Sequence, residues 1–104
     1  MIHVIAYVKL KPGTIPKVLD LYRILLPKIF AKEKGCIEYS PTVDFDFGAD
    51  NQNKNPDMII VRERWAVIDD FREHLNMAHS IEFRASIKDY LAERITVTIT
   101  QDAL

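Results

Sequence analysis

The stretch Glu63-Arg-Trp-Ala-Val-Ile-Asp-Asp-Phe-Arg-Glu-His-Leu-Asn-Met-Ala-His-Ser-Ile-Glu-Phe83 decides the fold, because it leads from a strand into a helix and holds two of the three histidines. The strand begins earlier, at Met58, and its side chains alternate between two faces. One face carries Ile59, Val61, Glu63 and Trp65, and the other carries Met58, Ile60, Arg62 and Arg64. A carboxylate, Glu63, therefore lies among apolar residues.

A helix follows this strand, and its spacing directs one histidine toward the core. Asp69 or Asp70 is well placed to cap the helix. Phe71, His74, Leu75 and Ala78 then fall on one helical stripe. His79 comes five residues after His74, which at about 100° per residue is roughly 140° around a continuous helix. The two histidines can share a pocket only if the helix breaks, and we expect that break near Asn76.

The first half of the chain predicts a strand and a long helix. Residues 2–10 are rich in β-branched and aromatic side chains, and the turn at Lys11-Pro-Gly13 ends them. His3 and Tyr7 share one face of this strand; an ordinary strand position is the commoner interpretation of His3, and a place in a pocket wall is the alternative. Apolar residues at helical spacing follow, and Gly35 is expected to end the helix. They are Ile15, Val18, Leu19, Tyr22, Leu25, Leu26 and Ile29.

The middle of the chain predicts a strand and a long polar loop. Alternation over residues 36–43 puts Ile37, Tyr39 and Val43 on one face and Cys36, Glu38, Ser40 and Thr42 on the other. Pro41 favours an edge position or a bulge, and Cys36 is interpreted as structural because no base neighbours it. Residues 44–57 are long for a loop in a compact domain, so we interpret them as a lid or a contact arm.

The last elements complete the predicted fold. Residues 80–93 continue the helical pattern, and residues 94–100 alternate strictly between apolar side chains and Arg or Thr. The order strand, helix, strand, strand, helix, strand is the ferredoxin-like βαββαβ arrangement, an α+β fold in which a four-stranded antiparallel sheet has both helices on one face. The length of 104 residues, with 48% hydrophobic content, predicts a single domain over residues 1–104.

Three stretches resemble one known family. The pattern Glu63-x-Trp65, then His74, His79 and Phe83, is similar to the antibiotic biosynthesis monooxygenase (ABM) domain family, which includes small quinol monooxygenases. Residues 35–44 resemble the second strand of that family, and residues 8–13 resemble its first turn. The resemblance implies a homodimer in which two sheets pack into an α+β barrel.

Composition excludes several classes of partner and cofactor. The net charge of −1 gives no electrostatic reason to expect nucleic acid or an acidic membrane surface, and no run of apolar residues approaches a membrane span. A single cysteine and no signal-peptide pattern make the cytoplasm the expected location. None of the three glycines fits a phosphate-binding loop, and two histidines five apart without a third ligand are a weak metal signal. We therefore expect no metal and no cofactor.

The function implied by the resemblance is cofactor-independent oxygenation of a small aromatic or quinol-type substrate by O₂. Such chemistry needs a base and a dry cavity with an aromatic wall. Glu63 with His74 or His79 is the candidate base. The candidate substrate contacts are Trp65, Tyr39, Phe83, His3 and Tyr7.

Geometry leads to one expectation about this site. Glu63, His74 and His79 should meet at a cavity between the sheet and the second helix, with Trp65 beside them. Glu63 itself has two open interpretations, a structural carboxylate paired with Arg or Lys, or a group whose pKa is raised by desolvation. Two other functions also stay open: an isomerase or tautomerase of a small oxygenated metabolite, and a non-catalytic small-ligand-binding dimeric barrel.

Overall fold

The computed structural model describes residues 1–104, and it confirms the ferredoxin-like α+β fold. The elements are β1 (Ile2–Lys9), α1 (Ile15–Lys32), β2 (Cys36–Val43), β3 (Met58–Trp65), α2 (Ile68–Asn76), α3 (Ala78–Ile87), the short 3₁₀ helix η1 (Lys88–Tyr90) and β4 (Thr96–Gln101). Three α-helices replace the two that were expected, because the second helix is divided. The last helix ends before Glu93 and the last strand starts after Arg94, each a few residues from the expected boundary.

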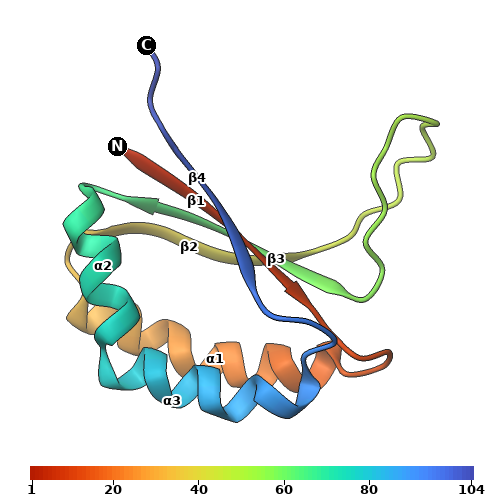
Figure 1. The fold of residues 1–104 in the computed structure, drawn as a ribbon, viewed down its shortest axis with the longest axis horizontal. Helices are drawn as coiled ribbons and strands as arrows, with labels where there is room; N and C mark the ends of the chain where they lie inside the picture. The colour runs from red at the N-terminus through yellow and green to blue at the C-terminus, as the bar shows by residue number, and fades with distance from the viewer.

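The sheet has the order β2-β3-β1-β4, and all neighbouring strands are antiparallel. All three helices lie on one side of it, and the other side is open (Figure 1). Alternate residues of β1 and β3 are buried under the helices, in line with the alternation read from the sequence. These are Val4, Ala6, Val8, Ile59, Val61, Glu63 and Trp65.

The core forms where α1 covers this sheet face. Val18, Tyr22, Leu25 and Ile29 are its buried residues, and they recur at three- and four-residue spacing. Each buried aliphatic or aromatic side chain contributes about 1.5–3 kcal/mol from the removal of apolar surface from water. This packing makes the helix side of the sheet dry.

Strand β2 differs from its expected pattern at one point. Cys36 lies opposite Trp65 and Glu38 lies opposite Arg64, so Ile37 is an extra residue in a bulge. Cys36 therefore lies on the core side of the sheet, and the expectation that it shares a face with Glu38 is wrong. The expected edge position is confirmed, since β2 pairs only with β3.

The break in the second helix falls at Met77, one residue beyond Asn76. Met77 has an extended backbone (φ −67°, ψ 141°) between α2 and α3. Its carbonyl then accepts hydrogen bonds from the backbone N–H groups of Ser80 and Ile81, which starts α3. The expected helix break is thus present, and it changes the direction of the chain between the two histidines.

The start of α2 packs closely on the turn that follows α1. Val67 is the N-cap, and its backbone N–H donates to Asp70 Oδ2 at 3.3 Å, so Asp70 acts from the third helical position and not as the cap. A Cβ atom at Gly35 would lie 2.1 Å from Asp70 Cγ, so only glycine fits there. Gly35 thereby holds α2 against the end of α1.

Residues 44–57 form an arm between β2 and β3 that projects away from the body of the protein (Figure 1). Hydrogen bonds inside the arm fix its shape: Gln52 Oε1 accepts from the N–H of Phe47 at 2.8 Å, and Gln52 Nε2 donates to the carbonyl of Phe45 at 2.6 Å. Phe45 and Phe47 are 78% and 79% exposed.

None of the protein's helices combines the length and apolarity that crossing a bilayer requires.

Candidate active site

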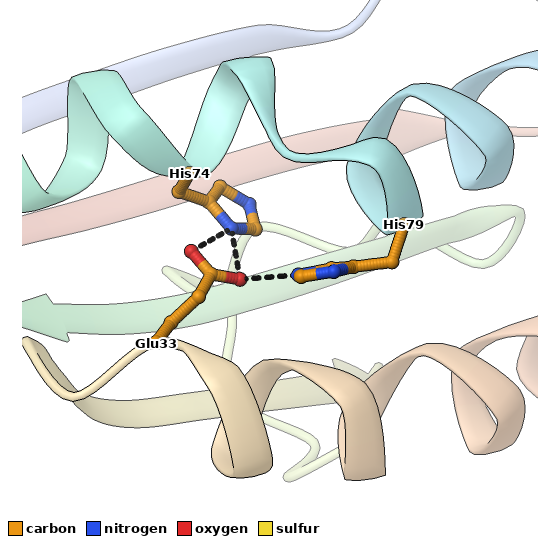
Figure 2. Close-up of side chains that lie close together, drawn as sticks. All are labelled: Glu33, His74 and His79. Atoms are coloured by element: carbon orange, nitrogen blue, oxygen red, sulfur yellow. Dashed lines mark hydrogen bonds and ion pairs between the residues drawn. The ribbon is translucent and has the colours of Figure 1, made fainter.

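The buried centre of the molecule holds a carboxylate between two imidazoles, those of Glu33, His74 and His79 (Figure 2). Glu33 Oε1 and Oε2 lie 2.9 and 3.0 Å from His74 Nδ1, and Oε2 lies 2.6 Å from His79 Nε2. Each of the three side chains is less than a tenth exposed. We call this group the Glu33 cluster.

Three different segments supply the cluster. Glu33 is the first residue after α1, where the chain turns toward β2. His74 lies in the last turn of α2 and His79 in the first turn of α3. The extended residue between these helices turns His79 toward the side that His74 faces, as the sequence predicted for a broken helix. Two helix ends and one loop therefore converge on a single carboxylate.

The hydrogen bonds of the cluster fix the protons of the histidines. An ionised carboxylate only accepts, so each imidazole donates from the nitrogen that faces Glu33. When His74 is neutral, its proton is on Nδ1 and its lone pair is on Nε2. Burial lowers the pKa of His74, and this effect exceeds the opposing attraction of Glu33. His74 is therefore a neutral imidazole at pH 7, with one nitrogen free to accept a proton.

The donor atoms of the cluster also match a metal ligand set, two histidines and one carboxylate. They all lie within 4.8 Å of one another. In the structure His74 Nδ1 and His79 Nε2 bond directly to the carboxylate of Glu33, so these facing atoms are paired with one another.

Glu63 is the second buried carboxylate. Its Oε1 accepts a hydrogen bond from Trp65 Nε1 at 3.0 Å, and no Arg or Lys lies within ion-pair distance of it. Burial raises the pKa of Glu63 to about 7, with a smaller contribution from the negative charge of Glu33 and an opposing one from Trp65. Of the two interpretations of Glu63, the structure favours the desolvated carboxyl that exchanges its proton near neutral pH.

A cavity of about 80 Å³ lies between the sheet and the helices, and we call it the sheet–helix pocket. Most of its wall is apolar, with a few polar groups. It is lined by Ala6, Val8, Tyr22, Leu25, Tyr39, Glu63, Phe71, His74, Leu75, Ser80, Phe83, Arg84, Ile95 and Val97. A buried cavity of about 150 Å³ holds benzene, so this pocket encloses only part of a six-membered ring.

Two tyrosines give the pocket neutral hydrogen-bond donors. Burial raises the pKa of Tyr22 and of Tyr39 well above the usual value, and the nearby charge of Glu63 raises both further. The two hydroxyls therefore stay protonated across the physiological range. Their rings contact the neighbouring aromatic groups, with centroids 4.4 Å apart for Tyr22 and Phe83 and 5.6 Å apart for Tyr39 and His74. The pocket thus combines a base, neutral O–H donors and an aromatic wall.

A second cavity, of about 180 Å³, lies between α1 and α3, and we call it the helix groove. It is lined by Leu21, Ile24, Leu25, Lys28, His79, Glu82, Phe83 and Ser86. His79 reaches this groove and not the sheet–helix pocket, while His74 lines the pocket. The histidines of the Glu33 cluster therefore reach two different cavities, and only His74 faces the space where Glu63 lies. Glu33 itself lines another cavity, of about 250 Å³, together with Trp65.

The structure brings together most of the predicted site residues, with two corrections. His74, Glu63, Tyr39 and Phe83 line the sheet–helix pocket. Trp65 lies behind this wall, where its ring packs 4.9 Å from His74 between centroids. The expected meeting of Glu63 with both histidines is found for His74 alone, because His79 does not line the pocket and the carboxylate between the imidazoles belongs to Glu33.

The second correction concerns the first strand. His3 pairs across the sheet with Arg64, and Tyr7 pairs with Ile60, so both lie on the open face. His3 Nε2 is hydrogen-bonded to Asp102 Oδ1 at 2.5 Å on that face. Within one chain, neither residue reaches the sheet–helix pocket, and the interpretation of both as contacts to a ligand there is wrong. The apolar neighbours Val4, Ala6 and Val8 occupy the pocket side instead.

Glu33 is the functional candidate that the sequence did not reveal. It lies in the polar run Lys32-Glu-Lys34 at the end of a helix, a pattern typical of solvent-exposed residues. The close approach of α2 at Gly35 encloses this turn and turns the carboxylate inward. The one available signal was Gly35 itself, two residues later, which marks a helix end and a close contact.

The sequence was compared with models of known protein families, and one of them matches. Residues 1–86 match the model of the antibiotic biosynthesis monooxygenase family. The chain belongs to this family. The match covers β1 through most of α3, and so it includes all three residues of the Glu33 cluster and Glu63.

Individual relatives agree with this assignment. A protein named probable quinol monooxygenase YgiN, from Escherichia coli K12, is 33% identical over 95 residues, covering 89% of this chain and 90% of the relative. A crystal structure named antibiotic biosynthesis monooxygenase is 26% identical, covers both chains fully and has a TM-score of 0.81. A conserved protein from Methanosarcina mazei has a TM-score of 0.80 at 22% identity, over 96% of this chain and 90% of that one. The last likeness is one of fold.

Proposed function

We propose that the protein is a cofactor-independent monooxygenase that oxidises a small aromatic, quinol-type substrate with O₂ in the sheet–helix pocket. The observation that carries this proposal is a buried carboxyl, Glu63, in a mostly apolar pocket, with a pKa of about 7. Family membership and the relative named probable quinol monooxygenase support the reaction class.

The chemistry balances without a cofactor. A hydroquinone loses a proton to a base, and the resulting electron-rich anion reduces O₂. One oxygen atom enters the ring and the other leaves as water, so that C₆H₆O₂ and O₂ give a hydroxyquinone, C₆H₄O₃, and H₂O. The substrate supplies all four electrons, and the protein has to accept and return protons and keep water away.

The pocket residues have separate roles in this proposal. Glu63 accepts the substrate proton, because its pKa matches neutral pH and one of its oxygens is free of hydrogen bonds within the chain. His74 Nε2 accepts a second hydrogen bond and orients the ring. Glu33 and His79 are positioning residues, since they hold the tautomer of His74 and do not line the pocket. The hydroxyls of Tyr22 and Tyr39 stabilise the anion.

Oxygen consumption with a panel of hydroquinones tests the proposal. We expect the purified protein, treated with EDTA, to consume one O₂ per hydroquinone and to release the hydroxyquinone. Because hydroquinones also react with O₂ unaided, the Glu63→Gln variant at equal concentration serves as the control, and we expect its rate to be at least about 10²-fold lower. Equal rates with the parent and the variant would overturn the proposal.

Two other outcomes point to other functions. Deuterium uptake at substrate carbons without consumption of O₂ would indicate an isomerase or tautomerase, which needs the same base and donors. Saturable binding of the ring without either reaction would indicate a ligand-binding barrel. The monooxygenase is favoured over both because the comparisons name that class for the family and for the 33% identical relative.

We also propose that the protein is a homodimer formed through the open face of the sheet. No element of the chain covers this face (Figure 1). It carries half-buried apolar residues, among them Ile5, Tyr7 and Ile60, beside the polar side chains of Arg62 and Thr98. A second copy of the same face would remove these apolar groups from water. The exposed Phe45 and Phe47 of the arm would then have a partner surface within reach.

Sedimentation tests the dimer. We expect the parent to sediment as a dimer at micromolar concentration and Ile60→Lys to sediment as a 12 kDa monomer. Ile24→Lys is the matched control, because Ile24 is 60% exposed on α1 and lies away from the open face. A monomeric parent would contradict the proposal, as would an Ile60→Lys variant that stays dimeric.

A cytoplasmic location belongs to the same proposal. The one cysteine, Cys36, is unpaired, and burial raises the pKa of its thiol to about 12, so it is a poorly reactive neutral thiol. Such a residue suits a reducing compartment, where no disulfide is formed. Fractionation of the cells that produce the protein tests this, and recovery in a secreted fraction would contradict it.

A further inference from the structure

The sheet–helix pocket has a second polar end, at its mouth. Glu63 and His74 lie at the enclosed end, where each residue is only 5% exposed. Arg84 of α3 lines the same pocket and is exposed. Two apolar lining residues beside the mouth, Leu75 and Val97, are 42% and 47% exposed. A ligand that enters the pocket therefore passes Arg84 before it reaches Glu63.

The guanidinium of Arg84 is held in place but not neutralised. Its Nη2 donates to the backbone carbonyl of Leu75 at 2.6 Å, near the end of α2. No carboxylate of the chain forms an ion pair with it, whereas Arg64, Arg72 and Arg23 each have one. A guanidinium has five N–H donors in a rigid fork, so one bond to a carbonyl leaves a pair that fits a carboxylate.

The charges along the pocket are ordered from the inner end to the mouth. Glu63 disfavours a negative group deep in the pocket, and Arg84 favours one at the mouth. Because the positive charge of Arg84 also lowers the pKa of His74, its field reaches the pocket interior. The remaining lining residues are neutral. A ring with its hydroxyl at the inner end and an anionic group at the outer end satisfies both charges.

We propose that Arg84 forms an anion subsite at the mouth of the sheet–helix pocket, and that the ligand is a single-ring hydroxyaromatic compound carrying a carboxylate. This inference rests on the proposed function for the place of the ring and its hydroxyl. It goes further in naming the ionised group and the residue that selects it. The alternative role of Arg84 is to close the end of α2 through Leu75, without any ligand.

Binding to a matched pair of ligands separates these two roles. The pair is 2,5-dihydroxybenzoate and its methyl ester, which share the ring and both hydroxyls and differ in the charge. We measure both dissociation constants by calorimetry under anaerobic conditions, so that no oxidation occurs. We expect the parent to bind the acid about tenfold more tightly than the ester, and this ratio to shrink in 0.5 M NaCl, because the mouth is open to solvent.

Variants of Arg84 make the test specific. Arg84→Gln removes the charge, so we expect the preference for the acid to disappear while the ester binds as before. Because the shorter amide does not reach the carbonyl of Leu75, the melting temperature measures separately the cost of losing that bond. Arg84→Lys keeps the charge without the fork and should retain part of the preference. Arg23→Gln, at an exposed position of α1 outside the pocket lining, is the control and should change neither constant.

Several results would overturn the subsite. They are a parent that binds neither ligand, a parent that binds both equally, and an Arg84→Gln variant that weakens both to the same degree. Oxygen uptake measured with the same two ligands separates this inference from the proposed function. Binding of the acid in preference to the ester without oxygen uptake keeps the subsite and refutes the monooxygenase. Equal oxidation of both ligands by the parent and by Arg84→Gln keeps the monooxygenase and refutes the subsite.

Discussion

On the helix side of the sheet Glu33 bonds to His74 and His79, and on the open side Glu38 bonds to Arg64 at 2.7 Å. The side chains of the first group are less than a tenth exposed, whereas Arg64 and Glu38 are 42% and 23% exposed. In the buried group desolvation lowers the pKa of His74. In the partly exposed pair the guanidinium of Arg64 lowers the pKa of Glu38. Similar charged and polar groups therefore form a buried, desolvated cluster on one side and a partly exposed ion pair on the other.

The largest difference between the two sides should appear in stability. Glu33→Ala removes the carboxylate acceptor that two buried imidazoles share, and the loss of one partner from a buried charged network costs about 3–5 kcal/mol. Glu38→Ala removes a solvent-exposed partner and should cost at most about 1 kcal/mol. Urea unfolding at pH 7.5 measures both free energies of unfolding. Similar losses for the two variants would mean that the buried Glu33 cluster contributes no more to the free energy of unfolding than the exposed pair does.

Catalysis should show the next largest difference. His74→Asn places an amide N–H where Nδ1 was, so the bond to Glu33 is kept while the lone pair of Nε2 is lost. We expect oxygen uptake to fall about 10²-fold, equivalent to about 2.7 kcal/mol, with the free energy of unfolding within about 1 kcal/mol of the parent. Asn is the informative replacement because His74→Ala would also leave Glu33 Oε1 without its partner.

The matched histidine on the open face is His3. His3→Asn removes an imidazole that bonds to Asp102 on the surface, and we expect the rate to stay within about twofold of the parent, since loss of an exposed pair is a small effect. A fall comparable to that of His74→Asn would place catalysis at the open face and contradict the assignment of the pocket.

The pH dependence of stability should have opposite signs on the two sides. The pKa of Glu63 is raised from 4.5 to about 7, so the folded state binds its proton more tightly than the unfolded state. Its contribution to stability is present below pH 4.5 and is lost as pH rises through about 7. Glu63→Gln should therefore be more stable than the parent by roughly 2–3 kcal/mol at pH 8.5. The difference should disappear near pH 4.5.

Glu38 provides the contrast for this measurement. Its pKa is lowered, so its contribution is present above the usual value of 4.5 and is lost as pH falls below it. Because the pair with Arg64 is open to solvent, Glu38→Gln should lower stability by at most about 1 kcal/mol at neutral pH. Unfolding curves between pH 4 and 9 check both signs. A Glu63→Gln variant without a gain at high pH would show that Glu63 is not desolvated.

Periodicity predicted the parts of this fold that depend on alternation and helical spacing. The apolar stripe of α1, the burial of Glu63 and the order of strands and helices along the chain follow from patterns of two and three to four residues. The helix break near Met77 could be predicted, because two histidines five residues apart cannot share a pocket on a continuous helix. These features are local, so the neighbouring residues in the sequence suffice to predict them.

The sequence failed where the outcome depends on contacts between distant segments. Glu33 lies 41 residues from His74, and only the packing of α2 on the turn at Gly35 brings the two together. The bulge at Ile37 shifts Cys36 to the core side, which strict alternation does not allow. His3 and Tyr7 were candidate ligand contacts, although their apolar neighbours on β1 are the residues that the helices cover.

The pH dependence of oxygen uptake tests the central claim, that Glu63 accepts the substrate proton in the sheet–helix pocket. The measurement is kcat/KM between pH 5.5 and 8.5 for the parent and for Glu63→Gln, with a hydroquinone whose own pKa lies well above this range. We predict that the parent rate rises with pH, with a midpoint near the Glu63 pKa of about 7, and that the variant is at least about 10²-fold slower and lacks this midpoint. A parent profile that is flat, or that persists unchanged in Glu63→Gln, would contradict the account.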